Sequence, residues 1–353
     1  MRCTDNRELT RQQRRIREQK RRRRRRRRIL LVLAILLAAA SAMLYYFVFR
    51  SHEIVFSDPY DIGHETYGVM DAIESGGRAV PFTDGLCVTA ADVSFDGINA
   101  DLAEAAAMMD LSSDNVLYAK NVHERLYPAS LTKIMTALVA MKYGNLDDVI
   151  FIDENALDID PLSSVCYLEY GDEFTLRQLI YGLLIASGND AANAIAYHVG
   201  GSIENFVAMM NQEAYALGAT NTNFVNAHGL QDENHYTTAY DIYLMFQEAL
   251  KYDVFQDAIN QTSYTVTYTK SDGYQYERTW FATNYYFTGE AAAPEEVTIY
   301  GGKTGTTDEA GSCLSLLSKD PYGNSYFSIV MRAYTKADLY DEMNELLSII
   351  NKK

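Results

Sequence analysis

Two residues of the chain have the spacing of a nucleophile and its base. Ser130 and Lys133 form the only Ser-x-x-Lys in the sequence, and residues three apart lie on one face of a helix. A lysine can activate a serine hydroxyl when burial or nearby positive charge lowers the lysine pKa. The apolar run that follows, residues 134–141, predicts a buried helix beginning here. Taken alone, the pair also fits a helix cap beside a surface lysine.

A Ser-x-Asn triplet occurs twice. Ser187-Gly188-Asn189 lies in a short polar turn between two apolar helical segments, where it can face a cleft. Ser113-Asp114-Asn115 lies between two predicted strands, where these residue types are ordinary turn formers. We therefore assign the first triplet to the site and the second to a turn. Ser187 can relay a proton to a leaving amine, and Asn189 can bind a substrate amide and orient Lys133.

The third pattern is Lys303-Thr304-Gly305, which ends a predicted strand and is followed by Thr306. Glycines in a strand often mark the close approach of another backbone, and an extended peptide can pair along such an edge. Lys303 supplies a positive charge, and Thr304 and Thr306 supply hydroxyls, to hold a carboxylate. A solvated strand end also explains the triplet when it is considered by itself.

The elements that must position these residues follow from the hydrophobic periodicity and from turn and cap signals. Helices are predicted over residues 131–143, 175–186, 190–198, 202–217, 238–251 and 336–350. Strands are predicted over residues 105–111, 115–120, 263–270, 274–281, 297–304, 312–318 and 325–334. Strands near both ends with helices between them predict an α+β fold, with one antiparallel sheet flanked by helices.

Ser-x-x-Lys, Ser-x-Asn and Lys-Thr-Gly in this order are the motif set of the penicillin-recognising serine acyl enzymes. The chain resembles the D-alanyl-D-alanine carboxypeptidases, which are low-molecular-mass penicillin-binding proteins. The likeness covers roughly residues 100–350 and extends beyond the three motifs. It is carried by residues 116–121, 127–130, 187–193, 223–230, 235–241, 302–307 and 310–314.

The resemblance implies the penicillin-binding and serine β-lactamase fold, with a five-stranded antiparallel sheet against a helical cluster. It implies that Ser130 is acylated, that Lys133 is its general base, and that Ser187 and Asn189 line the opposite wall. The sheet edge is then formed by Lys303, Thr304, Gly305 and Thr306. The backbone amides of Ser130 and Thr306 would form the oxyanion hole. Relatives often carry a His where this chain has Thr306, which could alter how the carboxylate is held.

The implied activity removes the terminal D-Ala from peptidoglycan stem pentapeptides through an acyl-Ser130 ester, which water then hydrolyses. Penicillin and other β-lactams would acylate the same serine as covalent inhibitors, and no cofactor is implied. Three alternatives remain: a transpeptidase or endopeptidase on the same substrate, a penicillin sensor without turnover, and a β-lactamase. The last needs a Glu to activate the deacylating water, and no Glu-x-x-Leu-Asn lies between Ser187 and Lys303.

The N-terminal region predicts a membrane anchor. Residues 1–28 form a basic tail that ends in eight arginines, and residues 29–49 are uncharged and long enough to cross a bilayer as a helix. The positive-inside rule keeps the tail cytoplasmic, so the catalytic domain, residues 98–353, is expected outside the cell membrane after a lead-in over residues 50–97. The alternative is a secreted protein cleaved near Ala42.

Charge and cysteine content exclude other classes of protein. Residues 51–353 hold 15 basic and 44 acidic residues, a net charge of −29, and so acidic a body is a poor binder of nucleic acid. The four cysteines match no zinc spacing, and the histidines show no His-Glu-x-x-His pair, so no metal site is expected. Three cysteines follow the anchor, which fits buried thiols or one optional disulfide.

Overall fold

The computed structural model describes residues 85–160 and 162–352, which lie within one compact unit. The basic tail, the membrane anchor and the cleavage position near Ala42 predicted above lie outside the described residues. Among the residues that are described, no helix is both long and apolar enough to cross a membrane.

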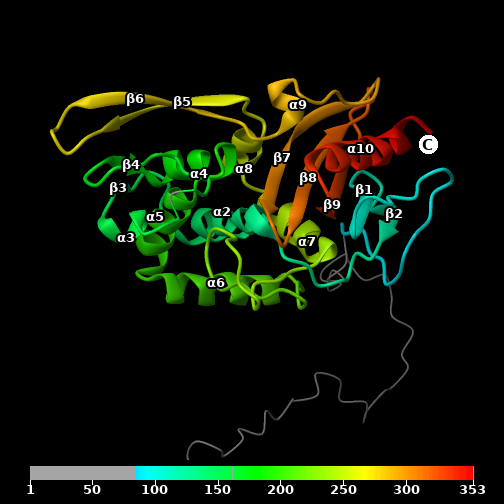
Figure 1. Cartoon of the computed structure of the whole chain (residues 1–353), viewed down its shortest axis with the longest axis horizontal. Helices are drawn as coiled ribbons and strands as arrows, with labels where there is room; N and C mark the ends of the chain where they lie inside the picture. Colours follow the sequence, from blue (N-terminus) through cyan, green and yellow to red (C-terminus); the bar gives the residue numbers. More distant parts are fainter. Residues whose placement is uncertain (1–84, 161, 353) are drawn as a thin grey trace, which may run out of the picture. The chain divides into compact units, whose positions relative to one another are not determined.

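The main sheet has five antiparallel strands in the order β2-β1-β9-β8-β7 (Figure 1). Its strands are β1 (Ala105–Asp110), β2 (Asn115–Lys120), β7 (Thr298–Thr307), β8 (Gly311–Lys319) and β9 (Ser325–Ala333). Both faces are covered, so β1, β8 and β9 are buried almost throughout. The expected five-stranded sheet is confirmed, and β7, which carries Lys-Thr-Gly, is one of its two edge strands.

Most of the helices form a cluster on one face of the sheet, and the last helix covers the other face (Figure 1). They are η1 (Ala129–Leu131), α2 (Thr132–Tyr143), α3 (Glu154–Leu157), α4 (Leu176–Ile185), α5 (Asn189–Gly200), α6 (Ile203–Ala216), α7 (Ala239–Ala249), α8 (Asp253–Ile259), α9 (Tyr285–Thr288) and α10 (Lys336–Leu347), followed by η2 (Ser348–Lys352). The side chains of Ser202 and Thr238, at the starts of two predicted helices, cap α6 and α7 by accepting a backbone N–H.

Helix α2 lies in the middle of the cluster, as its sequence predicts. Every residue from Thr132 to Met141 is buried, because α2 contacts α4, α5, α6 and α7. An aromatic contact joins the cluster to the sheet: the Phe327 ring of β9 lies 5.0 Å from Phe246 and 5.5 Å from Tyr243, both on α7. The nucleophile–base helix is therefore held from all sides.

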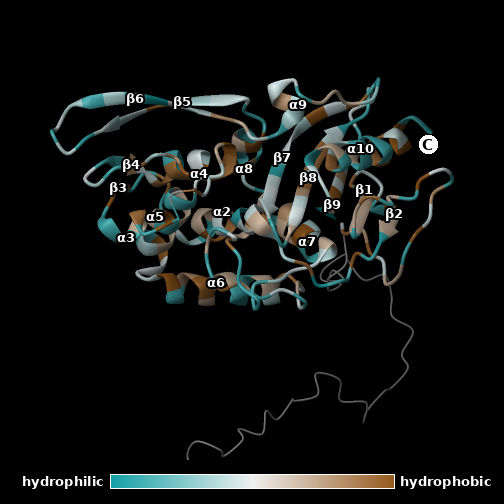
Figure 2. Ribbon diagram, in the orientation of Figure 1, coloured by the Kyte–Doolittle hydropathy of each residue, from teal (hydrophilic) through white to brown (hydrophobic). Residues whose placement is uncertain are grey.

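The expectation of a single sheet was wrong. A second sheet has the order β3-β4-β5-β6, from β3 (Val149–Phe151), β4 (Glu173–Thr175), β5 (Ser263–Thr269) and β6 (Gln275–Phe281). The β5–β6 hairpin was predicted, but it pairs with β4 rather than with the main sheet. The reason is an aromatic stack, in which the Tyr268 ring lies 4.6 Å from that of Phe174. Figure 2 shows that the rest of the hairpin is mostly hydrophilic.

The lead-in is part of the compact unit from residue 85 onward. Cys87 is fully buried, and its backbone N–H donates to the Tyr243 hydroxyl at 2.8 Å. Val93 pairs with Ala119 of β2. Cys87, Cys166 and Cys313 are all free and buried, which confirms the expectation of buried thiols for the described part of the chain.

Candidate active site

The nucleophile stands at the start of a helix whose entry is held by hydrogen bonds. Ala129, just before Ser130, has a φ of +47°, a conformation that L-residues rarely adopt. Its carbonyl accepts a 2.8 Å hydrogen bond from the Thr132 hydroxyl, which lies 2.8 Å from Nε2 of the buried His235. Gly229 packs directly against the same carbonyl, since a Cβ there would lie 1.9 Å from the oxygen. Ser130 itself is only partly buried, so its hydroxyl is accessible.

Lys133 points its amine at the nucleophile. Its Nζ lies 2.8 Å from Ser130 Oγ, 2.6 Å from Asn189 Oδ1 and 2.8 Å from the His228 carbonyl oxygen. The side chain is fully buried, and burial, followed by the charge of Lys303, holds the lysine pKa well below its usual value. These are the two conditions under which a lysine acts as a base.

The Ser-x-Asn turn connects α4 to α5. Ser187 has a φ of +61°, which reverses the chain so that Asn189 becomes the first residue of α5. The Asn189 backbone N–H donates to the Ser164 carbonyl at 2.8 Å, while its side-chain oxygen accepts from Lys133. Ser187 and Asn189 are both buried. The turn therefore contributes one hydroxyl and one amide to the same polar centre.

Strand β7 contributes the opposite side. Lys303 Nζ donates to Ser187 Oγ at 2.9 Å and to the Thr304 carbonyl at 2.8 Å, and burial lowers its pKa to about 7. Gly305 needs its lack of a side chain, because a Cβ there would lie 3.0 Å from the Ser130 amide nitrogen. This approach places the backbone before Thr306 against the nucleophile, as an oxyanion hole requires.

A pocket of about 140 Å³ opens onto these groups. It is lined by Ser130, Ser164, Ser187, Thr283, Tyr285, Thr304, Gly305, Thr306, Cys313, Lys336, Leu339 and Tyr340. A larger hollow of about 710 Å³ lies elsewhere, between α7 and the ends of β7, β8 and β9. None of the residues of the three motifs lines it, so we place the chemistry in the smaller pocket.

The structure brings together all eight site residues predicted from the sequence: Ser130, Lys133, Ser187, Asn189, Lys303, Thr304, Gly305 and Thr306. The rejected triplet, Ser113-Asp114-Asn115, lies in the β1–β2 turn, where the Ser113 hydroxyl donates to Asp110. No group of three or more His, Cys, Asp or Glu side chains in the described part of the chain could hold a metal ion.

Sequence reasoning missed several pocket residues, among them Ser164, Thr283 and Lys336. The Thr283 hydroxyl lies 2.5 Å from that of Thr304, and the Lys336 amine lies 5.4 Å from the centre of the Tyr285 ring. Lys336 begins α10 and gives the pocket a second cation. These residues belong to no motif, so only their place in the fold reveals them.

A serine–lysine pair, a second serine and a buried lysine on a sheet edge, within this two-sided helical and antiparallel architecture, define a penicillin-recognising serine acyl enzyme. Comparison with known proteins gives the family. The sequence model of the D-alanyl-D-alanine carboxypeptidase family matches residues 91–335, and the chain belongs to that family.

Individual relatives agree. The chain is 38% identical over 230 residues to D-alanyl-D-alanine carboxypeptidase DacF of Bacillus subtilis. This match covers 62% of the chain and 54% of the relative. It is 33% identical over 284 residues to DacC of Escherichia coli, covering 78% of this chain and 67% of the relative. The chain thus spans about half to two thirds of the length of these relatives.

A solved structure shows the same fold. The crystal structure of the Streptomyces K15 DD-transpeptidase superposes with a TM-score of 0.67 at 27% sequence identity. The match covers 74% of this chain and all of the other. The penicillin-binding fold expected from the resemblance is therefore confirmed for the described residues.

Proposed function

We propose that this protein is a serine-type D-Ala-D-Ala carboxypeptidase that removes the terminal D-Ala from peptidoglycan stem pentapeptides. The observation that carries the proposal is the buried amine of Lys133, 2.8 Å from Ser130 Oγ and facing a second buried lysine. The family and its named relatives supply the substrate class. β-Lactams, which mimic the acyl-D-Ala-D-Ala end, are the expected covalent inhibitors.

The acylation step follows from the geometry. Neutral Lys133 donates to Asn189 and His228 and turns its lone pair to the Ser130 hydroxyl, so it can accept that proton. Ser130 Oγ then bonds to the carbonyl carbon of the penultimate D-Ala, and the oxyanion that forms is stabilised by the amides of Ser130 and Thr306.

Collapse of this intermediate breaks the peptide bond. The leaving D-Ala nitrogen takes a proton from the Ser187 hydroxyl, and the Lys133 ammonium reprotonates Ser187, which returns Lys133 to its neutral form. Lys303 Nζ lies 2.9 Å from Ser187 Oγ and holds that hydroxyl in place. Before cleavage, Lys303 and the hydroxyls of Thr304 and Thr306 hold the terminal carboxylate. Water then attacks the acyl-Ser130 ester: neutral Lys133 accepts the water proton and gives it to Ser130 Oγ as the ester bond breaks.

Transpeptidation is the second candidate, because one observation favours it. The solved neighbour of the same fold is itself named a DD-transpeptidase. Both reactions share the acyl-Ser130 ester and differ only in the acceptor, which is water or the amine of a second stem peptide. An added amine acceptor that diverts product from hydrolysis would therefore reveal this activity.

We further propose that residues 29–49 anchor the protein in the cell membrane, with the arginine-rich tail in the cytoplasm and the catalytic domain outside. The support is the 21-residue uncharged segment directly after eight arginines. Membranes washed with alkaline carbonate should retain the full chain and release a variant that lacks residues 1–49. Release of the full chain would reject the anchor, and an N-terminus at about residue 43 would favour the cleaved form.

The activity is tested with the full chain in detergent and a diacyl tripeptide ending in D-Ala-D-Ala. We expect release of free D-Ala by the wild type, background release by Ser130→Ala, and none from the same peptide ending in L-Ala. No release by the wild type would reject the carboxypeptidase. A labelled penicillin would then distinguish a sensor, which acylates at Ser130 and stays labelled, from a β-lactamase, which releases the hydrolysed drug.

A further inference from the structure

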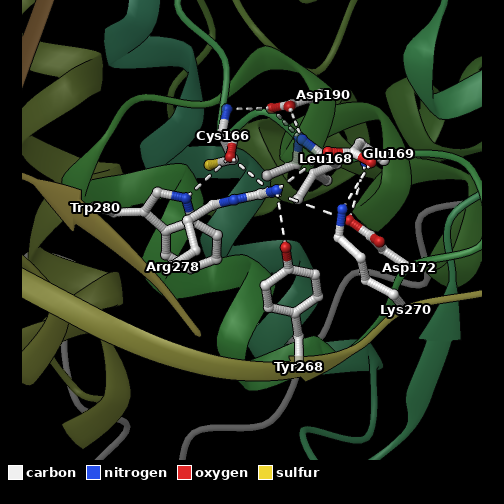
Figure 3. Close-up of polar contacts among 10 residues, drawn as sticks. Cys166, Leu168, Glu169, Asp172, Asp190, Tyr268, Lys270, Arg278 and Trp280 are labelled. Carbon is white, nitrogen blue, oxygen red and sulfur yellow. Dashed lines mark hydrogen bonds and ion pairs between the residues drawn. The ribbon is translucent and has the colours of Figure 1, made fainter. Parts of the chain in front are cut away.

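The segment from Ser164 to Leu168 joins two parts of the structure that sequence reasoning treated as unrelated. On one side it contacts the N-terminus of α5, which carries Asn189. On the other side it contacts the β5–β6 hairpin of the second sheet. Figure 3 shows the contacts of Cys166 with Asp190 on one side and with Arg278 and Trp280 on the other. Among the described residues, this segment is where the hairpin is hydrogen-bonded to the wall of the active site.

On the α5 side, backbone groups fix the segment to the Ser-x-Asn turn. The amides of Cys166 and Leu168 donate to the Asp190 carboxylate at 2.8 and 3.0 Å, and the Ser164 carbonyl accepts from the Asn189 amide at 2.8 Å. Gly188 and Cys166 are packed closely, because a Cβ on Gly188 would lie 2.3 Å from Cys166 Sγ. A displacement of Cys166 therefore moves the Ser187–Asn189 turn.

On the hairpin side, two β6 side chains hold the Cys166 carbonyl. Arg278 Nη1 donates to it at 3.3 Å and Trp280 Nε1 at 3.1 Å (Figure 3). The Arg278 side chain is only 17% exposed. Its guanidinium lies 4.9 Å from the centre of the Tyr268 ring, and its Nη2 donates to the Tyr268 hydroxyl at 3.0 Å.

The charges around Arg278 keep it in place. Its nitrogens lie 3.7 Å from a Glu169 oxygen and 4.0 Å from an oxygen of the buried Asp172. Lys270 of the same hairpin contacts Glu169 at 2.8 Å, and in the described part of the chain it makes no hydrogen bond to Cys166. Arg278 thus differs from its cationic neighbour in one respect that matters for the site: it reaches the Cys166 carbonyl.

We propose that Arg278 is a positioning residue for the reaction, acting through Cys166 on Asn189 and thereby on Lys133. It contacts neither the nucleophile nor the pocket. It fixes the backbone that sets where the Asn189 oxygen lies, and that oxygen accepts a 2.6 Å hydrogen bond from Lys133 Nζ. The inference rests on the proposed function, because it is Lys133 acting as base that makes this placement matter.

The test compares Arg278→Met with Lys270→Met, which removes a cation from the same hairpin and the same acidic neighbours. For Arg278→Met we expect kcat for D-Ala release and the rate constant of penicillin acylation to fall about tenfold or more, with KM within twofold. Lys270→Met should stay within twofold of wild type in all three. Arg278→Lys, which can still donate one hydrogen bond to the carbonyl, should recover part of kcat.

Loss of folding is separated from loss of positioning by thermal unfolding, with rates corrected to the folded fraction. If Arg278→Met does not fold, Trp280→Phe removes the other donor to the same carbonyl and should lower kcat in the same way. A corrected kcat for either variant equal to that of Lys270→Met overturns the proposal.

A second measurement does not depend on turnover. Absence of turnover in the wild type would reject the proposed function but would not test the role of Arg278. The pKa of Lys133 is read by NMR of ¹³C-labelled lysine, assigned with Lys133→Met. Displacement of the Asn189 acceptor removes a contact that stabilises the ammonium, so Arg278→Met should lower this pKa while Lys270→Met leaves it unchanged. The charged and titratable neighbours of Lys133 are the same in both variants: Lys303, Asp190, Cys166, His228 and His235. An unchanged pKa in Arg278→Met overturns the inference.

Discussion

Burial lowers the pKa of both Lys133 and Lys303, but the proposed reaction needs the two lysines in opposite protonation states. Among the described residues, no carboxylate lies within salt-bridge distance of either amine. Lys133 must be neutral to accept the Ser130 proton. Lys303 must be charged to hold a carboxylate, and its ammonium also donates a hydrogen bond to Ser187. We therefore expect the site to be active in the pH range where Lys133 is neutral and Lys303 is protonated.

This predicts a bell-shaped dependence of kcat/KM on pH, with Lys303 setting the alkaline side. Since the Lys303 pKa is about 7 in the free protein, kcat/KM should fall as pH rises above that value. Lys303→Arg keeps its charge at all these pH values, so its alkaline limb should move up by at least one pH unit, whatever its overall rate. The measurement is kcat/KM for D-Ala release between pH 5 and 10.

The control for this profile is Lys251→Arg, on the surface and outside the pocket. Its pH profile should match that of the wild type. An alkaline limb that stays in place in Lys303→Arg would show that another group sets it.

At the residue scale, the sequence predicted those site residues that lie close to one another along the chain. Ser130 and Lys133, or Ser187 and Asn189, lie within one turn of each other, so their relation is visible in the chain. Lys336 enters the pocket only because α10 packs against the sheet. No local pattern encodes that contact, and the same holds for Arg278, whose partner Cys166 is 112 positions away.

At the scale of the elements, the entry to α2 depends on a close backbone contact with the loop that carries Gly229. That glycine has a φ of +90°, and a Cβ would lie 1.9 Å from the Ala129 carbonyl oxygen. The contact fixes the residue just before the nucleophile. Packing between a loop and a helix start, rather than the helix alone, thus sets the position of Ser130.

We therefore predict that Gly229→Ala is destabilising and slows acylation. Left-handed strain costs about 1 to 2 kcal/mol, and overpacking adds about 1 to 3 kcal/mol. Gly273→Ala is the matched control, because Gly273 has a φ of +80° but nothing within 4 Å of the added Cβ. Gly273→Ala should lose only the stability that left-handed strain costs, and its acylation rate should equal that of the wild type. Urea unfolding and penicillin acylation measure the two effects, and equal losses in both variants would contradict the packing argument.

The elements themselves were predictable where they are long. The β5–β6 hairpin was visible from its alternating residues and its Ser-Asp-Gly turn, but its partner was not. That partner, β4, has three residues, as does β3, and strands so short carry no periodicity. Helix α8, with seven residues, was missed for the same reason. The assignment of the hairpin to the main sheet was wrong because pairing depends on aromatic packing across the chain.

At the scale of the whole molecule, acid should weaken the fold through His235, which is buried, and His228, which is partly buried. Burial lowers the pKa of His228 to about 3 and that of His235 to about 4. Below about pH 6.5 the unfolded chain takes up protons at these rings while the folded protein does not. The free energy of unfolding should thus decrease as pH falls from about 6.5 to about 4.

We predict that His235→Gln, although less stable at pH 7, loses less stability than the wild type between pH 7 and pH 5. The control is His123→Gln, since His123 is exposed and its replacement should leave the pH dependence close to that of the wild type. Unfolding temperatures at the two pH values give the comparison. A parallel decrease in His235→Gln and wild type would assign the acid sensitivity to other groups.

The pair of buried lysines also has an evolutionary consequence. Each ammonium gives up its hydration on folding without gaining a carboxylate partner, so the folded state is less stable than an apolar side chain of the same length would make it. A library selected for thermal resistance alone would therefore collect replacements such as methionine at positions 133 and 303, and the survivors would be inactive. Only continued selection for the proposed reaction would keep lysine at these two positions.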